Sequence, residues 1–368
     1  MRVQLLGAYL RKEIMELFRS RILFMVYILP TMILLLFGYG IRLEVTHART
    51  LIIDRDNSSL SLNLINALEH SKYFDAKVLA SSDQNALHTM KQAKADIIII
   101  IPPSFERDLL HKNPAEIGIY IDGSYPMRAL TMQSYVEGVI LHLAQTLLPK
   151  ALPIQIEYRA LFNQSMRDEN AIVPGLIGLV LLVAPAILAA LLIVKEKELG
   201  TIFNFYSSPL SKSDFLIAKL TPVFLLHSLN IFILFLWATY LFKVPFRGNF
   251  WLYWGVSELY VLISVGIGLL VSIVTNRQIV AVVLTVIITV IPGFLYSGIL
   301  MPISSMKGES AIEAHIFPVM YYNHIIYDAF LIGTGFSSAK NLLYAAILTL
   351  YALLLLFLGW ALLKKELK

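Results

Sequence analysis

Six hydrophobic stretches, each long enough to cross a lipid bilayer, constrain this chain more than any other feature. They cover residues 22–41, 172–194, 217–242, 251–275, 279–300 and 341–363. A helix rises about 1.5 Å per residue, so about 20 apolar residues cross a hydrocarbon core of about 30 Å. The last two stretches contain no charged residue, and 57% of the whole chain is hydrophobic. We therefore predict an α-helical integral membrane protein with six transmembrane helices.

The stretches are distributed unequally along the chain. The first, 22–41, stands alone, whereas the other five are packed into residues 172–368. The 130 residues between them, 42–171, are compatible with water and alternate strand-like with helix-like pieces. This alternation predicts a compact α/β domain between the first and second transmembrane helices. We expect strands at 51–54, 95–101, 116–121 and 154–158, and helices at 59–69 and 126–148.

Basic residues beside the ends of the stretches predict the orientation of the chain. Thirteen lysines and arginines lie before the first stretch, between the second and third, between the fourth and fifth, or after the sixth. Only four lie in the short loops on the opposite side. Because positive charge gathers on the cytoplasmic side of membrane proteins, both termini are predicted to be cytoplasmic and residues 42–171 extracytoplasmic. The net charge of +5 therefore gives no reason to expect nucleic-acid binding.

Residues 1–21 carry an amphipathic pattern. Apolar side chains recur at helical spacing at Leu6, Leu10, Ile14 and Leu17, which predicts a helix lying flat at the cytoplasmic membrane surface. Such a helix either anchors the chain or contacts a cytoplasmic partner. The polar face is assigned to Arg11, Lys12, Glu13 and Glu16. No small-x-small cleavage site precedes Arg42, so the first stretch is expected to remain as a signal anchor.

The cytoplasmic loop at 195–215 is the most suggestive polar segment. Gly200 predicts a turn, the aromatic run 202–206 predicts a short helix, and Ser207-Ser208-Pro209 ends it. Ser211 or Ser213 is expected to cap the next helix. A short aromatic helix at the inner face either fits a groove of a partner protein or is a re-entry turn with lipid-facing aromatic rings. The candidate contact residues are Glu196, Lys197, Glu198, Gly200, Thr201, Phe203, Ser208 and Pro209.

The fifth stretch contains a candidate translocation path. Pro292-Gly293 is expected to interrupt the helix, and such breaks belong inside protein or beside a water-filled path; the alternative is a kink in a packed helix. The path candidates are Thr285, Thr289, Pro292, Gly293 and Tyr296. His227 and Glu258 lie well inside the stretches, and Lys219 lies at the edge of the third; such sparse charge disfavours a proton-coupled carrier.

Motifs for nucleotides and metals are absent from the sequence. There is no G-x-x-x-x-G-K-[S/T] phosphate loop, no H-E-x-x-H and no cysteine. His324 and Asp328 lie at i,i+4, but two ligands are too few for a metal site. We expect no cofactor in this chain and no enzymatic activity of its own.

Short motifs occur in a fixed order along about 330 residues. They are Leu10-Arg11-Lys12-Glu13, Asp54-Arg55-Asp56-Asn57-Ser58, Ile101-Pro102-Pro103-Ser104-Phe105, Tyr120-Ile121-Asp122-Gly123-Ser124, Asn170-Ala171-Ile172-Val173-Pro174-Gly175, Lys197-Glu198-Leu199-Gly200-Thr201 with Ser208-Pro209-Leu210, and Ser297-Gly298 with Met301-Pro302-Ile303. Together they resemble the permease subunits of ABC-2 type transporters, especially the bacterial drug-exporter subset. Many members carry an acidic residue after the Gly-Thr pair, whereas Ile202 and Phe203 follow here.

The resemblance implies a bacterial inner-membrane exporter built from two permeases, either two copies or a pair of paralogues. Two separate cytoplasmic ABC ATPase subunits would bind ATP and magnesium and would move the loop at 196–209 and the amphipathic helix. The path would open outward for a hydrophobic or amphipathic substrate, and a periplasmic adaptor is a further partner to consider. Two other functions remain open: an ion-coupled carrier, and a non-transporting membrane scaffold or sensor.

Overall fold

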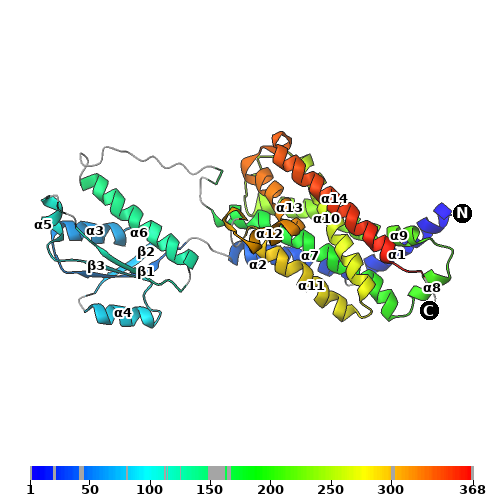
Figure 1. Cartoon of the computed structure of the whole chain (residues 1–368), viewed down its shortest axis with the longest axis horizontal. Coiled ribbons are helices and arrows are strands. Elements are labelled where there is room, and N and C mark those ends of the chain that lie inside the picture. Colours follow the sequence, from blue (N-terminus) through cyan, green and yellow to red (C-terminus); the bar gives the residue numbers. More distant parts are fainter. Residues whose placement is uncertain are drawn as a thin grey trace. The chain divides into compact units, whose positions relative to one another are not determined.

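The computed structural model describes residues 2–19, 22–40, 45–79, 82–111, 113, 115–124, 126–147, 162–163, 167–299 and 303–365. The chain divides into two compact units (Figure 1). The first combines Met1–Ile41 with Ala160–Lys368, and the second is Arg42–Arg159. We call them the membrane unit and the α/β unit and describe each by itself.

The membrane unit is a bundle of helices. Its α-helices are α1 (Arg2–Arg19), α2 (Ile22–Gly40), α7 (Asp168–Glu198), α8 (Ile202–Ser207), α9 (Lys212–Leu236), α10 (Phe250–Val274), α11 (Gln278–Leu295), α12 (Glu309–Ile316), α13 (Pro318–Tyr327) and α14 (Ala339–Leu362). Single turns of π-helix extend α9 over Trp237–Leu241 and α13 over Asp328–Ile332, and short 3₁₀ turns lie at Ile303–Ser305 and Gly335–Ser337.

Five helices of the described chain are long and apolar enough to cross a membrane. They are α7, α9 with its π-helical end, α10, α11 and α14. In α2 the described part with this character, Tyr27–Gly40, is shorter. The expectation of a mostly helical membrane protein is therefore confirmed, with five of the six predicted spans meeting the criterion of length and composition.

Helix α7 is the centre of the membrane unit. Of its most apolar 18-residue window 83% is buried, against 17% for α14. Small residues permit the close contacts: a Cβ at Gly178 would lie 1.9 Å from Oδ1 of Asn323, and one at Gly268 would lie 2.2 Å from the Ala186 carbonyl oxygen. Close packing of this kind holds helices together in lipid, where the hydrophobic effect between helices is absent.

Pro292-Gly293 does not interrupt α11 as expected, because the helix continues to Leu295. The Tyr296 amide then donates to the Pro292 carbonyl oxygen at 2.9 Å. Gly293 lies against α7, where a Cβ would approach Leu179 to 2.8 Å. Gly293 therefore allows close contact with α7, and Pro292 lies within the helix without ending it.

The α/β unit is a four-stranded sheet covered by helices. Its elements are β1 (Ala48–Asp54), α3 (Ser59–Glu69), β2 (Phe74–Val78), α4 (Asp83–Lys91), β3 (Ile97–Ile101), α5 (Phe105–Leu110), β4 (Gly118–Ile121) and α6 (Pro126–Leu147). The strand order is β2-β1-β3-β4. The first three strands are parallel and β4 is antiparallel to β3.

Strand β3 consists of five isoleucines and is covered on both faces. Ile97, Ile99 and Ile101 pack into a core with α3, α5 and α6, while Ile98 packs with Ala86 of α4 on the opposite face. Figure 1 shows α4 on one side of the sheet and α3 and α6 on the other. A continuous apolar run is typical of a strand buried on both faces.

Most of the predicted elements of this unit are found. Helix α3 has the expected bounds, and β1, β3 and β4 contain or overlap the expected strands. Strand β2 and helices α4 and α5 were not predicted, and the strand expected at 154–158 lies outside the described residues. Residues 168–171, assigned to the α/β domain from the sequence, form the first turn of α7.

Candidate functional site

The segment after α7 forms a hairpin that presents α8, and we call residues 199–211 the α8 hairpin. Gly200 has a φ of +74°, a left-handed conformation that glycine adopts at little cost. At the far end the Ser211 hydroxyl accepts a hydrogen bond from the Asp214 amide at 3.2 Å and caps α9. The expected turn at Gly200 and a cap at Ser211 are found, whereas residues 195–198 and 212–215, predicted as loop, belong to α7 and α9.

The α8 hairpin is anchored on one side and apolar on the other. Phe205 is buried and stacks on Phe215 of α9 with ring centroids 4.1 Å apart. The Lys365 ammonium donates to the carbonyl oxygens of Ser208 and Leu210 at 2.7 and 2.6 Å. Leu199 and Phe203, in contrast, are 64% and 50% exposed. The hairpin is therefore held firmly while offering an apolar edge.

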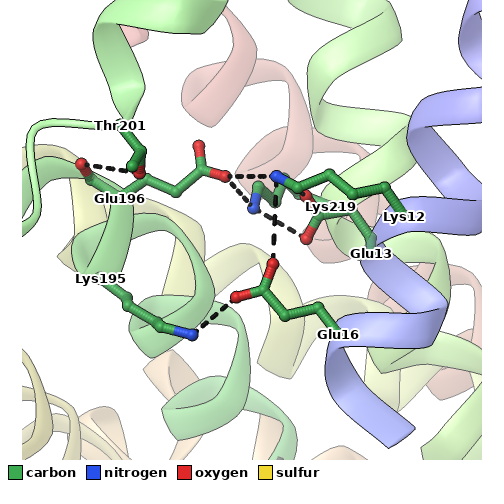
Figure 2. A network of polar contacts seen from close by, with 7 residues as sticks. All are labelled: Lys12, Glu13, Glu16, Lys195, Glu196, Thr201 and Lys219. Carbon is green, nitrogen blue, oxygen red and sulfur yellow. Dashed lines mark hydrogen bonds and ion pairs between the residues drawn. The ribbon is translucent and has the colours of Figure 1, made fainter. Parts of the chain in front are cut away.

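A buried ionic cluster lies behind this hairpin (Figure 2). The Lys219 ammonium of α9 is 2.8 Å from Oε2 of Glu13 in α1 and 2.5 Å from Oε1 of Glu196 in α7. The side chains of Lys219, Glu13 and Glu196 are only 2%, 2% and 9% exposed. Buried charges persist only where partners satisfy them. The cluster therefore ties three helices together at one point.

A more exposed layer of charges surrounds this cluster. Lys12 is 3.1 Å from Glu13 and 3.4 Å from Glu196, and Lys195 is 2.6 Å from Glu16. Burial lowers the pKa of Lys12, but the carboxylates of Glu13 and Glu196 outweigh this effect and the pKa is raised. The hydrogen bond from Lys195 lowers the pKa of Glu16 despite partial burial. Both groups are thus held in their charged forms, and Figure 2 shows them around Lys219.

The burial of Glu13 corrects its assignment to the polar, water-facing side of α1. The carboxylate is turned into the bundle because Lys219 is there to neutralise it, and that partner lies 206 positions away in the sequence. Lys219 itself looked like one more basic residue at the edge of a span. Its position seven residues after the start of α9 at Lys212 was the signal available, because a lysine at that depth needs a carboxylate.

Several predicted contact residues bind neighbouring helix ends. The Lys197 ammonium donates to the carbonyl oxygens of Ser272, Ile273 and Thr275 at the end of α10. The Glu198 carboxylate accepts hydrogen bonds from the amide and the side chain of Gln278 at 3.0 and 2.9 Å, which caps α11. The Thr201 hydroxyl donates to the Glu196 carbonyl oxygen at 3.4 Å. The end of α7 is therefore connected to α10 and α11 as well.

The five path candidates lie at two different places. Thr285 and Thr289 are buried in α11, and each hydroxyl donates to a carbonyl oxygen one turn earlier at 2.7 Å. Pro292 and Gly293 are also buried. Tyr296 follows the end of α11, where its hydroxyl bonds to Glu313 and its ring stacks on Phe317 at 5.2 Å. Within this chain the four α11 residues are buried, and their place in a translocation path stays a prediction.

The described residues contain no group of three or more His, Asp or Glu side chains arranged to hold a metal ion. In the pair noted in the sequence, His324 and Asp328, the Asp328 carboxylate has other partners. It accepts hydrogen bonds from the Thr334 hydroxyl, the Gly335 amide and the Asn341 side chain at 2.5, 2.9 and 2.8 Å. Asp328 therefore joins the end of α13 to the start of α14.

Comparison with known proteins identifies the family. Residues 20–361 match the model of the ABC-2 family transporter protein. The chain is 28% identical over 348 residues to a probable multidrug ABC transporter permease, YbhS, of Escherichia coli K12, covering 92% of this chain and 90% of that protein. It is 27% identical over 330 residues to the similarly described YbhR, covering 89% of each. The motif order predicted this result, and the chain belongs to the ABC-2 family of transporter proteins.

Proposed function

We propose that this chain is the membrane permease of an ATP-driven exporter whose ATPase is a separate cytoplasmic subunit. The observation that carries the proposal is the α8 hairpin, which is anchored by Phe205 and Lys365 and exposes Leu199 and Phe203. An exposed apolar edge on a well-held element is suited to a groove in a partner protein. The names of the relatives, multidrug ABC transporter permeases, support the same function.

The contacts of α7 suggest how movement of the hairpin would spread. Gly200 joins the hairpin to α7, and the Lys219 cluster joins α7 to α1 and α9. Lys197 and Glu198 connect the same end of α7 to α10 and α11. A push by the ATPase on α8 would therefore move these helices together, and two such permeases, identical or paralogous, would rock against one another to open an outward path.

The proposed cargo is hydrophobic or amphipathic. The spanning helices of the described chain carry few ionisable side chains, and a charged solute would need compensating charges that cost free energy in lipid. In this proposal the chain has six spans in a bacterial inner membrane with both termini cytoplasmic, and the α/β unit is extracytoplasmic. ATP and magnesium would bind the partner ATPase, and a periplasmic adaptor could receive the cargo.

Reconstitution tests this function. Proteoliposomes would contain the chain alone, the chain with its ATPase subunit, or the chain with an ATPase unable to hydrolyse ATP, and export of a lipophilic fluorescent dye would be followed. We expect ATP-dependent export only with the active ATPase. Export by the chain alone under an ion gradient would show a secondary carrier. An ATPase that never associates with the chain would favour a scaffold or sensor.

A further inference from the structure

A cavity of about 630 Å³ lies beside the Lys219 cluster. Its walls come from α1, the end of α7, the α8 hairpin and the start of α9. The charged side chains that line it are Lys12, Glu16, Lys195, Glu196 and Lys219. Apolar and aromatic side chains include Tyr9, Leu192, Leu199, Phe205 and Leu210. The cavity therefore offers ionic partners of both signs next to an apolar wall.

The cavity extends into the depth expected for lipid. Leu192 lies one turn before Glu196 in α7, and Lys219 lies two turns into α9. Both belong to segments long and apolar enough to cross a membrane. Helix α1, which forms another wall, exposes the apolar side chains of Met15 and Phe18, as an interfacial helix does. An occupant that reaches Lys219 therefore needs a polar head and an apolar remainder.

The charges around the cavity balance. The three lysines are matched by Glu16, Glu196 and by Glu13, which lies behind Lys219. A ligand with net charge would leave one charge uncompensated, whereas a zwitterion can pair with both signs. The cluster thus favours a head that carries one cation and one anion.

One oxygen of Glu196, a residue that lines the cavity, is left without a hydrogen bond in the described part of the chain. Oε1 of Glu196 binds Lys12 and Lys219, but Oε2 is buried and has no hydrogen bond among the described residues. The Tyr9 hydroxyl interacts with this carboxylate, and burial together with Glu196 raises the pKa of Tyr9, yet Oε2 still lacks a donor of normal geometry. A buried acceptor without a donor is costly, so a ligand N–H would be bound favourably there.

We propose that this cavity binds the headgroup of a phospholipid that carries a primary amine. Its ammonium would donate to Oε2 of Glu196, and its phosphate would lie between Lys12 and Lys195, which are partly exposed. The glycerol carbons would contact Leu192 and Phe205. Basic pockets between helices on the cytoplasmic side are known to hold lipid headgroups, and here the extra carboxylate selects for an amine that has N–H donors.

The primary amine gives a sharp test, because a choline headgroup has the same charges but no N–H. The full-length chain would be purified, stripped of lipid, and mixed with equal amounts of phosphatidylethanolamine and phosphatidylcholine of identical acyl chains. Retained lipid would be counted by native mass spectrometry. One charge-assisted hydrogen bond predicts a preference of about tenfold for the primary amine. This binding assay is independent of whether the chain transports anything.

Three variants locate the binding. Glu196→Gln removes the charge of the acceptor and is expected to abolish the preference. Because that change also disturbs Lys219, a second variant, Ala8→Trp, fills the cavity from an exposed position of α1 without changing any charge, and it is expected to release both lipids. Glu258→Gln, a carboxylate that pairs with Ser228 in α9, is the matched control and should keep the tenfold preference.

Equal retention of the two lipids by the unmodified chain would overturn the proposal. An undiminished preference in Ala8→Trp, in protein that elutes as a single folded species, would also overturn it. If the preference disappears when the ATPase subunit is added, a side chain of that protein occupies the cavity instead of a lipid.

Discussion

The two units each contain a charged cluster, and the clusters are built as opposites. In the membrane unit a cation, Lys219, lies between two carboxylates. In the α/β unit a carboxylate, Asp96, lies 2.8 Å from Arg49 and 3.4 Å from Arg128. The arginine side chains are 46% and 45% exposed, whereas all members of the first cluster are buried.

This difference in exposure indicates different roles. The Asp96 cluster stabilises the fold of its unit, whereas the Lys219 cluster connects helices that are proposed to move. Water screens the two arginines, so the cluster around Asp96 can lose a member at modest cost. It joins the beginnings of β1 and β3 to α6, within one folded unit. The cluster around Lys219 has no such screening and lies among α1, α7 and α9 next to the α8 hairpin. We therefore expect function to depend on the Lys219 cluster and only stability to depend on the Asp96 cluster.

The largest effect is expected for Lys219→Met. The change leaves two buried carboxylates with only the half-exposed Lys12 as a cation, and breaking a buried ion pair in this way costs about 3–5 kcal/mol. Thermal unfolding in detergent should show the loss of stability, and ATP-driven dye export should fall below detection. Normal export by Lys219→Met would show that the Lys219 cluster does not transmit movement between the helices.

A neutral triple variant separates stability from transmission. Glu13→Leu, Glu196→Leu and Lys219→Met together replace the charges of the buried cluster by apolar side chains of similar volume, and such replacements are often neutral or stabilising. We expect the unfolding temperature to return close to that of the unmodified chain. ATP hydrolysis should still be uncoupled from export. Export restored together with stability would mean that the three charges serve folding alone.

The next effect in size is expected for the double variant Gly200→Leu with Glu198→Ala. A residue other than glycine at a φ of +74° costs about 1–2 kcal/mol, and loss of the Glu198 carboxylate removes the cap of α11. Insertion into the membrane should persist, while export falls at least about tenfold because 1.4 kcal/mol corresponds to a factor of ten. Unchanged export would show that the α8 hairpin is wrongly assigned as the contact with the ATPase.

A smaller effect, confined to the α/β unit, is expected for Asp96→Asn. Hydrogen bonds from Arg49 lower the pKa of Asp96 and outweigh the effect of burial. Because the folded pKa lies below the ordinary value of about 3.9, the cluster stabilises the unit above about pH 4 and this stabilisation is lost as the pH falls through the folded pKa. Hydrogen exchange of the β3 amides should speed up in the variant at pH 7, and less so in acid, with export unchanged.

The smallest effect is expected for Glu16→Gln, the matched control for the buried cluster. The pair of Glu16 with Lys195 joins the same helices, α1 and α7, but its side chains are only partly buried. Exposed pairs contribute about 0–1 kcal/mol, so both thermal unfolding and export should stay near normal. If Glu16→Gln lost as much export as Lys219→Met, burial would not explain why the Lys219 cluster matters more than the exposed pair.

The sequence predicts local features better than contacts between residues that are far apart in the chain. Hydropathy located the spans, and the Gly200 turn and the Ser211 cap follow from neighbouring residues alone. Strand β2 gave no signal, because only Phe74 of its five residues is buried. The central place of α7 and the burial of Glu13 could not be predicted, since both depend on contacts between helices far apart in the chain.

The absence of cysteine from this chain allows the most direct test of where the ATPase acts. Single cysteines would replace Phe203 of the α8 hairpin and Leu62 of the α/β unit, which are 50% and 55% exposed, and cross-linking to the ATPase subunit would be measured in intact membranes. We predict a cross-link from Phe203→Cys and none from Leu62→Cys. A cross-link from position 62 and none from position 203 would contradict the account.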